Sequence, residues 1–243
     1  MQRGAFLKGK LALVTGGSKG IGKGIAARLV ELGATVAISG RNAADLEAAA
    51  KELSEKGVRP LTIRADVSRP DDVKRMFEEI DGAGRLDVLV NNAGVAIAKA
   101  FVDITPEEFD MVMEINARGA FLCGQEAMRR MAGRGGRIIN ISSASGLRGR
   151  ETEGAYAPSK HAMMALSKVM ALEGQKDGII IQIICPNGVA TPMIRKVNPS
   201  LDFNTMIAID DLADAVEFLL NQDGNAFTDV LTLRRRENIP YPC

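Results

Sequence analysis

Residues 10–34 read KLALVTGGSKGIGKGIAARLVELGA and join an apolar strand to an amphipathic helix through a glycine-rich turn. Lys10–Thr15 is a short apolar run, and Gly20–Leu32 repeats its apolar residues at helical spacing. The glycines of Gly16–Gly22 between them allow the backbone to approach a ligand closely. The following helix offers free N–H groups and the positive end of its dipole to an anion. The Gly-x-x-x-Gly-x-Gly spacing therefore indicates a pyrophosphate-binding turn, although a plain glycine-rich turn has the same composition.

Strand-like and helix-like runs alternate from this point to the end of the chain. Further strands are expected at Thr35–Ser39, Pro60–Arg64, Leu86–Val90, Arg137–Ile141, Ile179–Ile184 and Val230–Leu233. Helices are expected at Ala43–Glu55, Arg69–Asp81, Thr105–Met131, Tyr156–Glu173 and Asp210–Leu220, and the helix over 105–131 is apolar enough to be largely buried. The strands are continuously apolar, which is typical of burial on both faces. The pattern predicts one α/β domain over residues 1–243, a doubly wound parallel sheet with helices on both faces.

Composition excludes several classes of protein. The 243 residues carry a formal net charge of +1, which does not favour a nucleic-acid or membrane partner. Three cysteines without Cys-x-x-Cys spacing and a single histidine, His161, do not indicate a disulfide framework or a catalytic metal. No signal-peptide core begins the chain, and no apolar run approaches the roughly 18 residues of a membrane span. We expect a cytoplasmic protein.

The end of the second expected strand bears on which dinucleotide would bind. An acid there would hydrogen-bond the adenosine ribose of NAD(H), whereas an arginine would accept the 2′-phosphate of NADP(H). The chain has Arg41 at this point and no acid before Asp45, and Lys19 in the glycine turn adds a second cation. Both cations favour NADP(H). NAD(H) stays open, because Arg41 can stack on adenine in either case and both cations can be solvated surface charges.

Polar and small residues follow the next two expected strands at the same sheet edge, where ligands bind in such folds. Asp66, followed by Val67, can accept a hydrogen bond from the adenine amino group or can cap the next helix. In the run Asn91-Asn-Ala-Gly94, the small residues Ala93 and Gly94 leave room for a ribose. The asparagines, including Asn92, can brace neighbouring strands, so part of this motif can be structural.

Ser143, Tyr156 and Lys160 form a candidate proton-delivery group. Tyr156 and Lys160 are four residues apart in an expected helix and therefore share a face. Ser143 follows the fifth strand at the edge where Tyr156 begins its helix. The positive charge of Lys160, helped by the positive charge of the oxidised cofactor, is expected to lower the pKa of Tyr156 from about 10 toward neutrality, so that the phenol can protonate an alkoxide. An ordinary exposed Tyr–Lys pair is the alternative.

The chain resembles the short-chain dehydrogenase/reductase family over nearly its full length, and in particular members like the 3-oxoacyl-[acyl-carrier-protein] reductases. The matching motifs are Thr15-Gly-x-x-x-Gly-x-Gly22, Asp66, Asn91-Asn-Ala-Gly94, Asn116, Ser143, Tyr156-x-x-x-Lys160 and Pro186–Thr191. The resemblance implies a Rossmann-type sheet of seven strands and catalysis by Ser143, Tyr156 and Lys160. It also implies that Asn116 holds a water that relays protons to Lys160, and that Lys160 holds the nicotinamide ribose. From the residues alone, Asn116 only interrupts an apolar helix.

The resemblance and the residues together give one set of expected cofactor contacts. These are Gly16, Ser18, Lys19, Gly20, Ile21, Gly22, Arg41, Asp66, Val67, Asn92, Ala93, Gly94, Tyr156, Lys160, Pro186, Val189 and Thr191. Val189 and Thr191 would contact the carboxamide end of the nicotinamide. Two departures from the family occur: Asn187 stands where a glycine is common, with Gly188 one place later, and the usual glycine-rich end is replaced by a tail over 233–243. The resemblance implies a homodimer or a homotetramer. Because the C-terminal region packs between subunits in many members of the family, the different tail favours the dimer over the tetramer.

The substrate is expected to be a moderately hydrophobic carbonyl compound or the corresponding alcohol. A loop or lid over 191–209 would cover it and contains Met193, Ile194, Val197, Leu201, Phe203 and Met206. A 3-oxoacyl thioester on an acyl carrier protein is one candidate, with Arg129, Arg130, Arg134 and Arg137 as a docking site for the acidic carrier. Favourable interaction of these arginines with a helix C-terminus is the alternative.

Two other functions fit the same motifs. An NAD-dependent alcohol dehydrogenase would share every catalytic residue, since the reaction is reversible. A non-catalytic NADP(H)-binding regulator would share the fold. The presence of Ser143, Tyr156, Lys160 and Asn116 disfavours the regulator, because a sensor has no need of them.

Overall fold

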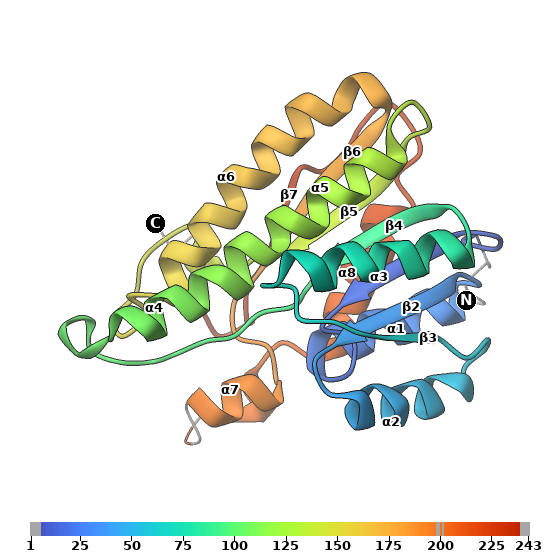
Figure 1. The fold of residues 1–243 in the computed structure, drawn as a ribbon. Coiled ribbons are helices and arrows are strands. Elements are labelled where there is room, and N and C mark those ends of the chain that lie inside the picture. The colour runs from blue at the N-terminus through green and yellow to red at the C-terminus, as the bar shows by residue number, and fades with distance from the viewer. Residues whose placement is uncertain (1–5, 198–199, 201, 239–243) are drawn as a thin grey trace.

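A single parallel sheet of seven strands, in the order β3-β2-β1-β4-β5-β6-β7, forms the centre of the molecule (Figure 1). The structure, a computed structural model, describes residues 6–197, 200 and 202–238. Leu201, the side chain of Val197 and the last residues of the C-terminal tail, 239–243, lie outside the described residues. The doubly wound α/β fold expected from the sequence is confirmed.

The strands and most helices lie at or close to their expected bounds, whereas α7 is a short helix in the segment expected to be a loop or lid. The strands are β1 (Leu11–Thr15), β2 (Thr35–Gly40), β3 (Leu61–Arg64), β4 (Leu86–Asn91), β5 (Gly136–Ile141), β6 (Ile179–Pro186) and β7 (Val230–Leu233). The helices are α1 (Gly20–Glu31), α2 (Ala43–Ser54), α3 (Pro70–Ala83), α4 (Pro106–Met113), α5 (Gly119–Met131), α6 (Tyr156–Gly174), α7 (Pro192–Val197) and α8 (Ile209–Leu220). No helix in this described part of the chain is long and apolar enough to cross a membrane.

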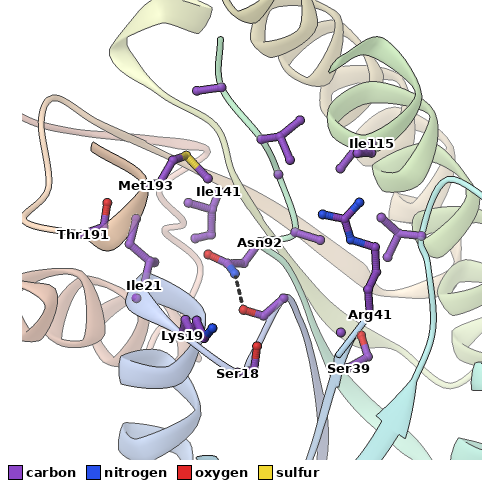
Figure 2. Close-up of a pocket in the computed structure, with 18 of the residues that line it drawn as sticks. Ser18, Lys19, Ile21, Ser39, Arg41, Asn92, Ile115, Ile141, Thr191 and Met193 are labelled. Atoms are coloured by element: carbon purple, nitrogen blue, oxygen red, sulfur yellow. Dashed lines mark hydrogen bonds between the residues drawn. The ribbon is translucent and has the colours of Figure 1, made fainter. Parts of the chain in front are cut away.

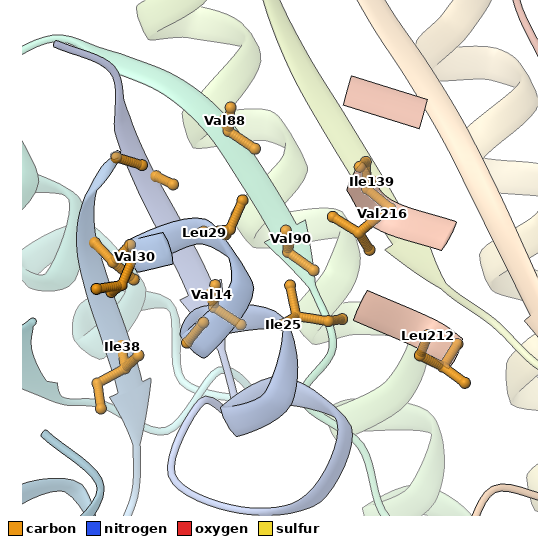
Figure 3. Close-up of a cluster of buried hydrophobic side chains, with 14 of the residues drawn as sticks. Val14, Ile25, Leu29, Val30, Ile38, Val88, Val90, Ile139, Leu212 and Val216 are labelled. Atoms are coloured by element: carbon orange, nitrogen blue, oxygen red, sulfur yellow. The ribbon is translucent and has the colours of Figure 1, made fainter. Parts of the chain in front are cut away.

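Two hydrophobic cores cover the two faces of the sheet. On one face, α1, α2 and α8 pack against the strands, with Leu29 and Val216 meeting Val90 and Ile139 (Figure 3). On the other face, α3 and α5 pack against side chains that point the opposite way, and Phe77 is fully buried there. The central strands are buried on both faces, as expected. The edge strands β3 and β7 are not, because each has a neighbour on one side only.

The helix expected over 105–131 differs from the expectation in two ways. It begins at a capping box, in which the Thr105 side chain accepts from the N–H of Glu108 and the Glu108 carboxylate accepts from the N–H of Thr105. It then widens into a π-helical turn, Glu114–Arg118, between α4 and α5. Much of its outer face is exposed, including Phe109 and Phe121, so the helix is less buried than its apolar composition predicts.

The strand order places the site. The chain runs outward from β1 through β2 to β3 and then crosses back to β4 on the other side of β1. In parallel sheets, ligands bind at the carboxyl edge where the order reverses. All of the strand pairs run parallel, so the segments that follow β1, β2, β4 and β5 meet at this edge.

Candidate active site

The glycine turn leaves the N-terminus of α1 open. Gly16 and Gly20 have φ values of +65° and +55°, which side chains disfavour, so glycine is required at both positions. Lys19 stands at the N-cap with no side-chain cap, and the first turn of α1 carries no acid. The free N–H groups at this end can therefore receive an anion without displacing a side chain.

Asn92 holds the turn in place from the end of β4. The Asn92 side chain points toward the glycine turn (Figure 2). Its amide nitrogen donates to the carbonyl oxygens of Thr15, at 2.9 Å, and Gly16, at 3.2 Å. The Thr15 hydroxyl accepts in return from the N–H groups of Asn92 and Ala93. A Cβ on Gly22 would lie 2.4 Å from the Asn92 amide nitrogen and from the Gly16 oxygen. Gly22 and Asn92 thus shape the turn. The role of the Thr15 hydroxyl was not predicted, because a threonine at the end of a strand has no distinctive pattern.

A groove of about 510 Å³ runs along the carboxyl edge of the sheet, a size typical of small-molecule and cofactor sites (Figure 2). Of the residues expected to bind a cofactor, the groove is lined by Gly16, Ser18, Lys19, Gly20, Ile21, Arg41, Asp66, Val67, Asn92, Ala93, Gly94, Tyr156, Lys160 and Thr191. The expected residues outside this lining are Gly22, Asn116, Ser143, Pro186 and Val189. Ile115 and Ser142 also line it and were not expected to, and Met193, which was expected in the lid, lines it as well.

The part of the groove that follows β1 and β2 contains both expected cations, but one of them is paired. Lys19 Nζ lies 2.6 Å from a carboxylate oxygen of Asp45, and both residues line the groove. Arg41 also lines the groove. The two expected cations are therefore not equivalent, because Asp45 offsets the charge of Lys19.

Asp66 stabilises the turn that enters α3. Its carboxylate accepts from the N–H and the hydroxyl of Ser68, and its own N–H donates to Asp72. This backbone hydrogen bond is the main cause that lowers the pKa of Asp72. Arg69, not Asp66, occupies the N-cap of α3. Asp66 therefore supports the turn before the helix while it faces the groove.

Ser143, Tyr156 and Lys160 come together at the end of the groove near β5. Tyr156 is the first residue of α6, and Ser143 follows β5 by two positions. The Ser143 hydroxyl lies close enough to the Tyr156 phenol to oppose the rise of its pKa. Lys160 is buried, and its ammonium donates to the carbonyl oxygen of Ile141 at 2.9 Å while it lies 5.8 Å from the centre of the Tyr156 ring.

The pKa values of the pair differ from the expectation. Burial raises the pKa of Tyr156 to about 12, the hydrogen bond with Ser143 acts against this shift, and the charge of Glu153 adds to it. Burial lowers the pKa of Lys160 to about 8. In the protein alone the pKa of Tyr156 is thus raised and not lowered, because burial is the largest cause and disfavours the charged phenolate. The expected lowering also included the positive charge of the oxidised cofactor.

Asn116 lies in the π-helical turn and connects three segments of the site. Its amide nitrogen donates to the carbonyl oxygen of Val95 and to the hydroxyl of Ser159, each at 2.9 Å. Its amide oxygen accepts from the N–H of Val95 at 2.8 Å. Ser159 precedes Lys160 on α6, so Asn116 fixes the position of the lysine relative to β4. π-turns of this kind are frequent at functional sites.

A protein-family model described as short chain dehydrogenase matches residues 10–202. The chain therefore belongs to the short-chain dehydrogenase/reductase family, as its motifs implied, and it is an oxidoreductase of that family.

Two curated relatives and one solved structure extend the comparison. A 3beta-hydroxysteroid dehydrogenase from Mediterraneibacter gnavus is 36% identical over 99% of this chain and 88% of that protein. An NADPH-dependent aldehyde reductase-like protein, chloroplastic, from Arabidopsis thaliana is 35% identical over 90% of each chain. The crystal structure of a short-chain type dehydrogenase/reductase from Mycobacterium marinum matches with a TM-score of 0.89, at 31% identity and 98% coverage of both chains.

Proposed function

We propose that this protein is an NADP(H)-dependent oxidoreductase that interconverts a ketone or aldehyde with an alcohol. The observation that carries the proposal is the position of Tyr156 and Lys160, with Ser143 beside the phenol, at one end of a groove that also contains an open helix N-terminus. The groove can hold an extended dinucleotide, and the three side chains can handle a carbonyl oxygen and its proton.

The described residues fit a nicotinamide dinucleotide. The uncapped N-terminus of α1 fits the pyrophosphate, and Arg41 fits the 2′-phosphate of NADP(H). The relative from Arabidopsis thaliana, which is named as NADPH-dependent, supports the same choice. Tyr156, Lys160 and Thr191 line the end proposed for the nicotinamide. When bound, the nicotinamide supplies or accepts the hydride.

Tyr156 is the proposed acid in the direction of reduction. With a pKa of about 12, its phenol carries its proton throughout the neutral range and can pass it to a developing alkoxide. Ser143 donates a hydrogen bond to the same substrate oxygen and stabilises its growing charge. Lys160 holds the ribose and supplies positive charge beside the phenol. In the direction of oxidation, the positive charge of the oxidised nicotinamide is needed to favour the tyrosinate.

Asn116 is proposed to hold a water that relays protons to Lys160. Its amide nitrogen already donates hydrogen bonds to Val95 and Ser159, so it has no further hydrogen to donate. Only the amide oxygen of its side chain can still accept a hydrogen bond from a water. Its larger contribution is to hold α6, and with it Lys160, at the correct distance from β4.

The substrate is proposed to lie between the segment that follows β5 and the lid over 191–209. The arginines expected to dock an acyl carrier protein do not favour that partner. Arg129 is paired with Glu126, and Arg130 is paired with Glu126 and Asp81. They lie at the end of α5 that leads into the amino end of β5, whereas the catalytic side chains lie at the carboxyl end.

A homodimer is also proposed, through the outer faces of α4, α5 and α6. Exposed apolar side chains gather on these helices, namely Phe109, Met111, Phe121, Val169 and Leu172. Leu172 is 76% exposed, which is unfavourable for a monomer. Apolar helix faces of this kind are typical of permanent interfaces.

The experiment that tests the proposed function has two steps. NADPH and NADH are titrated into the protein, and oxidation of the preferred one is then followed with β-keto esters, 3-oxoacyl thioesters, diketones, quinones and sugars. Tight binding of NADPH with turnover supports the proposal. A strong preference for NADH favours the NAD-dependent alcohol dehydrogenase, and tight binding without turnover on any class favours the regulator.

Asp45→Asn is expected to strengthen NADPH binding by about two- to fivefold and to leave NADH binding unchanged. The substitution frees Lys19 from its carboxylate partner, and an exposed ion pair of this kind is worth up to about 1 kcal/mol. Glu52→Gln is the matched control, because it frees Lys23 from a partner at the same 2.6 Å distance, and Lys23 does not line the groove. Equal effects on NADPH and NADH would argue against a 2′-phosphate site at Lys19.

A further inference from the structure

Two arginines lie against consecutive residues, Asn187 and Gly188, of the turn that follows β6. The Arg150 guanidinium donates to the side-chain oxygen of Asn187 at 2.8 Å. A Cβ built on Gly188 would lie 3.4 Å from Arg235 Cδ and 3.5 Å from its Nε, so Arg235 covers the next residue of the same turn. The N–H of Asn187 donates to the carbonyl oxygen of Leu233, which brings the end of β7 and the tail beyond it to this point.

Neither arginine has an acidic partner among the described residues. Arg150 contacts only a neutral amide, and the Arg235 Nε is buried without any hydrogen-bond partner. Arg150 is exposed and Arg235 is partly buried. Two other arginines with little exposure have acidic partners, since Arg28 contacts Asp214 and Glu217 and Arg130 contacts Asp81 and Glu126. The partly buried Arg137 instead donates to neutral oxygens, so among these arginines only Arg235 has a buried donor atom, Nε, outside the reach of both acids and neutral acceptors. A buried donor without a partner is costly, and an anion at this turn would remove the cost.

The turn lies on the side of the site where the substrate is proposed to bind. Gly188 precedes Val189, which forms a β-bridge with Ile207 at the end of the lid. Arg150 belongs to the segment that connects Ser143 with Tyr156. β7 lies beside β6 at the edge of the sheet, and the tail continues from its carboxyl end (Figure 1). The two arginines therefore lie at the carboxyl edge, as do the catalytic side chains.

The negative charge of Glu153 lies near Tyr156, whereas the positive charges of Arg150 and Arg235 lie at the turn after β6. The Glu153 carboxylate is close enough to Tyr156 to raise the pKa of the phenol, and one of its oxygens is buried without a hydrogen-bond partner. An anionic group would be repelled from the Glu153 side and attracted to the arginine side. A substrate with a carbonyl at one end and an anion at the other would thus enter with its carbonyl toward Tyr156.

We propose that Arg150 and Arg235 bind a carboxylate of the substrate, so that the enzyme prefers oxo acids over neutral ketones. The inference rests on the proposed reductase function and names the substrate class for the same site. Two guanidinium groups at one turn match the geometry and charge of a carboxylate. Asn187 orients Arg150 toward the turn, which gives a role to the asparagine that departs from the family pattern.

The test compares oxo acids with their methyl esters. Reduction of acetoacetate and levulinate, and of the methyl ester of each, is measured with the wild type and with Arg150→Gln and Arg235→Gln. We expect kcat/KM for the acids to fall by about ten- to hundredfold in each variant, since a hydrogen bond to a charged group is lost. We expect kcat/KM for the esters to change by less than about threefold. Arg236→Gln is the control, because it removes an exposed arginine of the same tail.

The outcomes separate this inference from the proposed function. The carboxylate site is contradicted if the wild type reduces the esters as well as the acids. It is also contradicted if kcat/KM for acids and esters falls equally in the variants. In both cases the proposed reductase activity is still supported. If the wild type reduces neither, the proposed function fails for these compounds. Calorimetric titration of levulinate into the protein with NADP⁺ then still tests the site. Binding that weakens in Arg235→Gln and not in Arg236→Gln supports it, and equal or absent binding in all three proteins overturns it.

Discussion

Tyr156→Phe is expected to lower kcat by about a hundred- to ten-thousandfold and to leave the affinity for NADPH nearly unchanged. The substitution removes only the phenolic oxygen, which is the proposed proton donor, and general acid catalysis contributes about this factor. The ring remains to fill its place at the start of α6. Steady-state kinetics and fluorescence titration of NADPH measure the two quantities on the same preparation.

The control for this variant is Ser143→Ala, which removes the partner of Tyr156 and keeps the acid. Its kcat is expected to fall less, by about ten- to hundredfold, because a donor to the substrate oxygen is lost while the proton source remains. If Tyr156→Phe keeps its activity within about tenfold of the wild type, another group delivers the proton and the assignment is wrong.

Lys160→Met is expected to remove most of the activity and yet to stabilise the fold. Lys160 is buried, and burial lowers its pKa from 10.5 to about 8, which means that the folded state disfavours its charge. A shift of this size corresponds to a cost on the order of 3 kcal/mol when the lysine is charged. Methionine has a similar length and no charge, so it avoids the cost and loses the contact with Ile141. Activity and stability are therefore opposed at this position.

The stabilisation by Lys160→Met is expected to decrease as the pH rises. Between about pH 8 and 10.5 the unfolded chain holds the Lys160 proton more tightly than the folded chain, so the wild-type free energy of unfolding rises with pH in this interval. Below pH 8 both states hold the proton, and the full cost is present. Lys160→Met lacks this titration, and its advantage should be largest below pH 8 and disappear near pH 10.5.

Urea unfolding at several pH values measures this difference. Lys168→Met is the matched control, because Lys168 is exposed on the same helix and carries no such cost. A Lys160→Met variant that is less stable than the wild type at neutral pH, with no change in the difference up to pH 10.5, would contradict the burial cost.

The fold could be predicted because its determinants are local. Each strand is a short apolar run, each helix has its own apolar face, and Gly16 and Gly20 occupy backbone conformations that favour glycine. The parallel order then follows from the alternation of strands and helices. The same logic brings Ser143 and Tyr156 together, since one follows β5 and the other begins the next helix at the same edge.

The features that the sequence did not predict depend on contacts between distant segments. The π-helical turn at Glu114–Arg118 has no distinct composition, and it is visible only once Asn116 is seen to bind Val95 and Ser159. The pairing of Lys19 with Asp45 depends on how α2 approaches the glycine turn. A charge count at the end of β2 could not distinguish a free cation from a paired one.

The raised pKa of Tyr156 was unexpected for a related reason. The spacing of Tyr156 and Lys160 predicts an attraction between a tyrosinate and an ammonium, but it carries no information on burial. In the folded protein both groups are desolvated, and burial moves each pKa toward the neutral form of the group. The pair is therefore set for proton donation in the protein alone.

Hydride transfer is tested most directly with NADPH that carries deuterium in place of both hydrogens on the reactive carbon of its nicotinamide, because a label on one face alone would be missed if the enzyme used the other face. The labelled cofactor is mixed with the wild type and a carbonyl substrate from the panel, and the alcohol product is examined by mass spectrometry. The account predicts one deuterium on the carbinol carbon of the product for each NADPH consumed, and no labelled product with Tyr156→Phe on the same time scale. NADPH that binds tightly but leaves no deuterium in any product would contradict it.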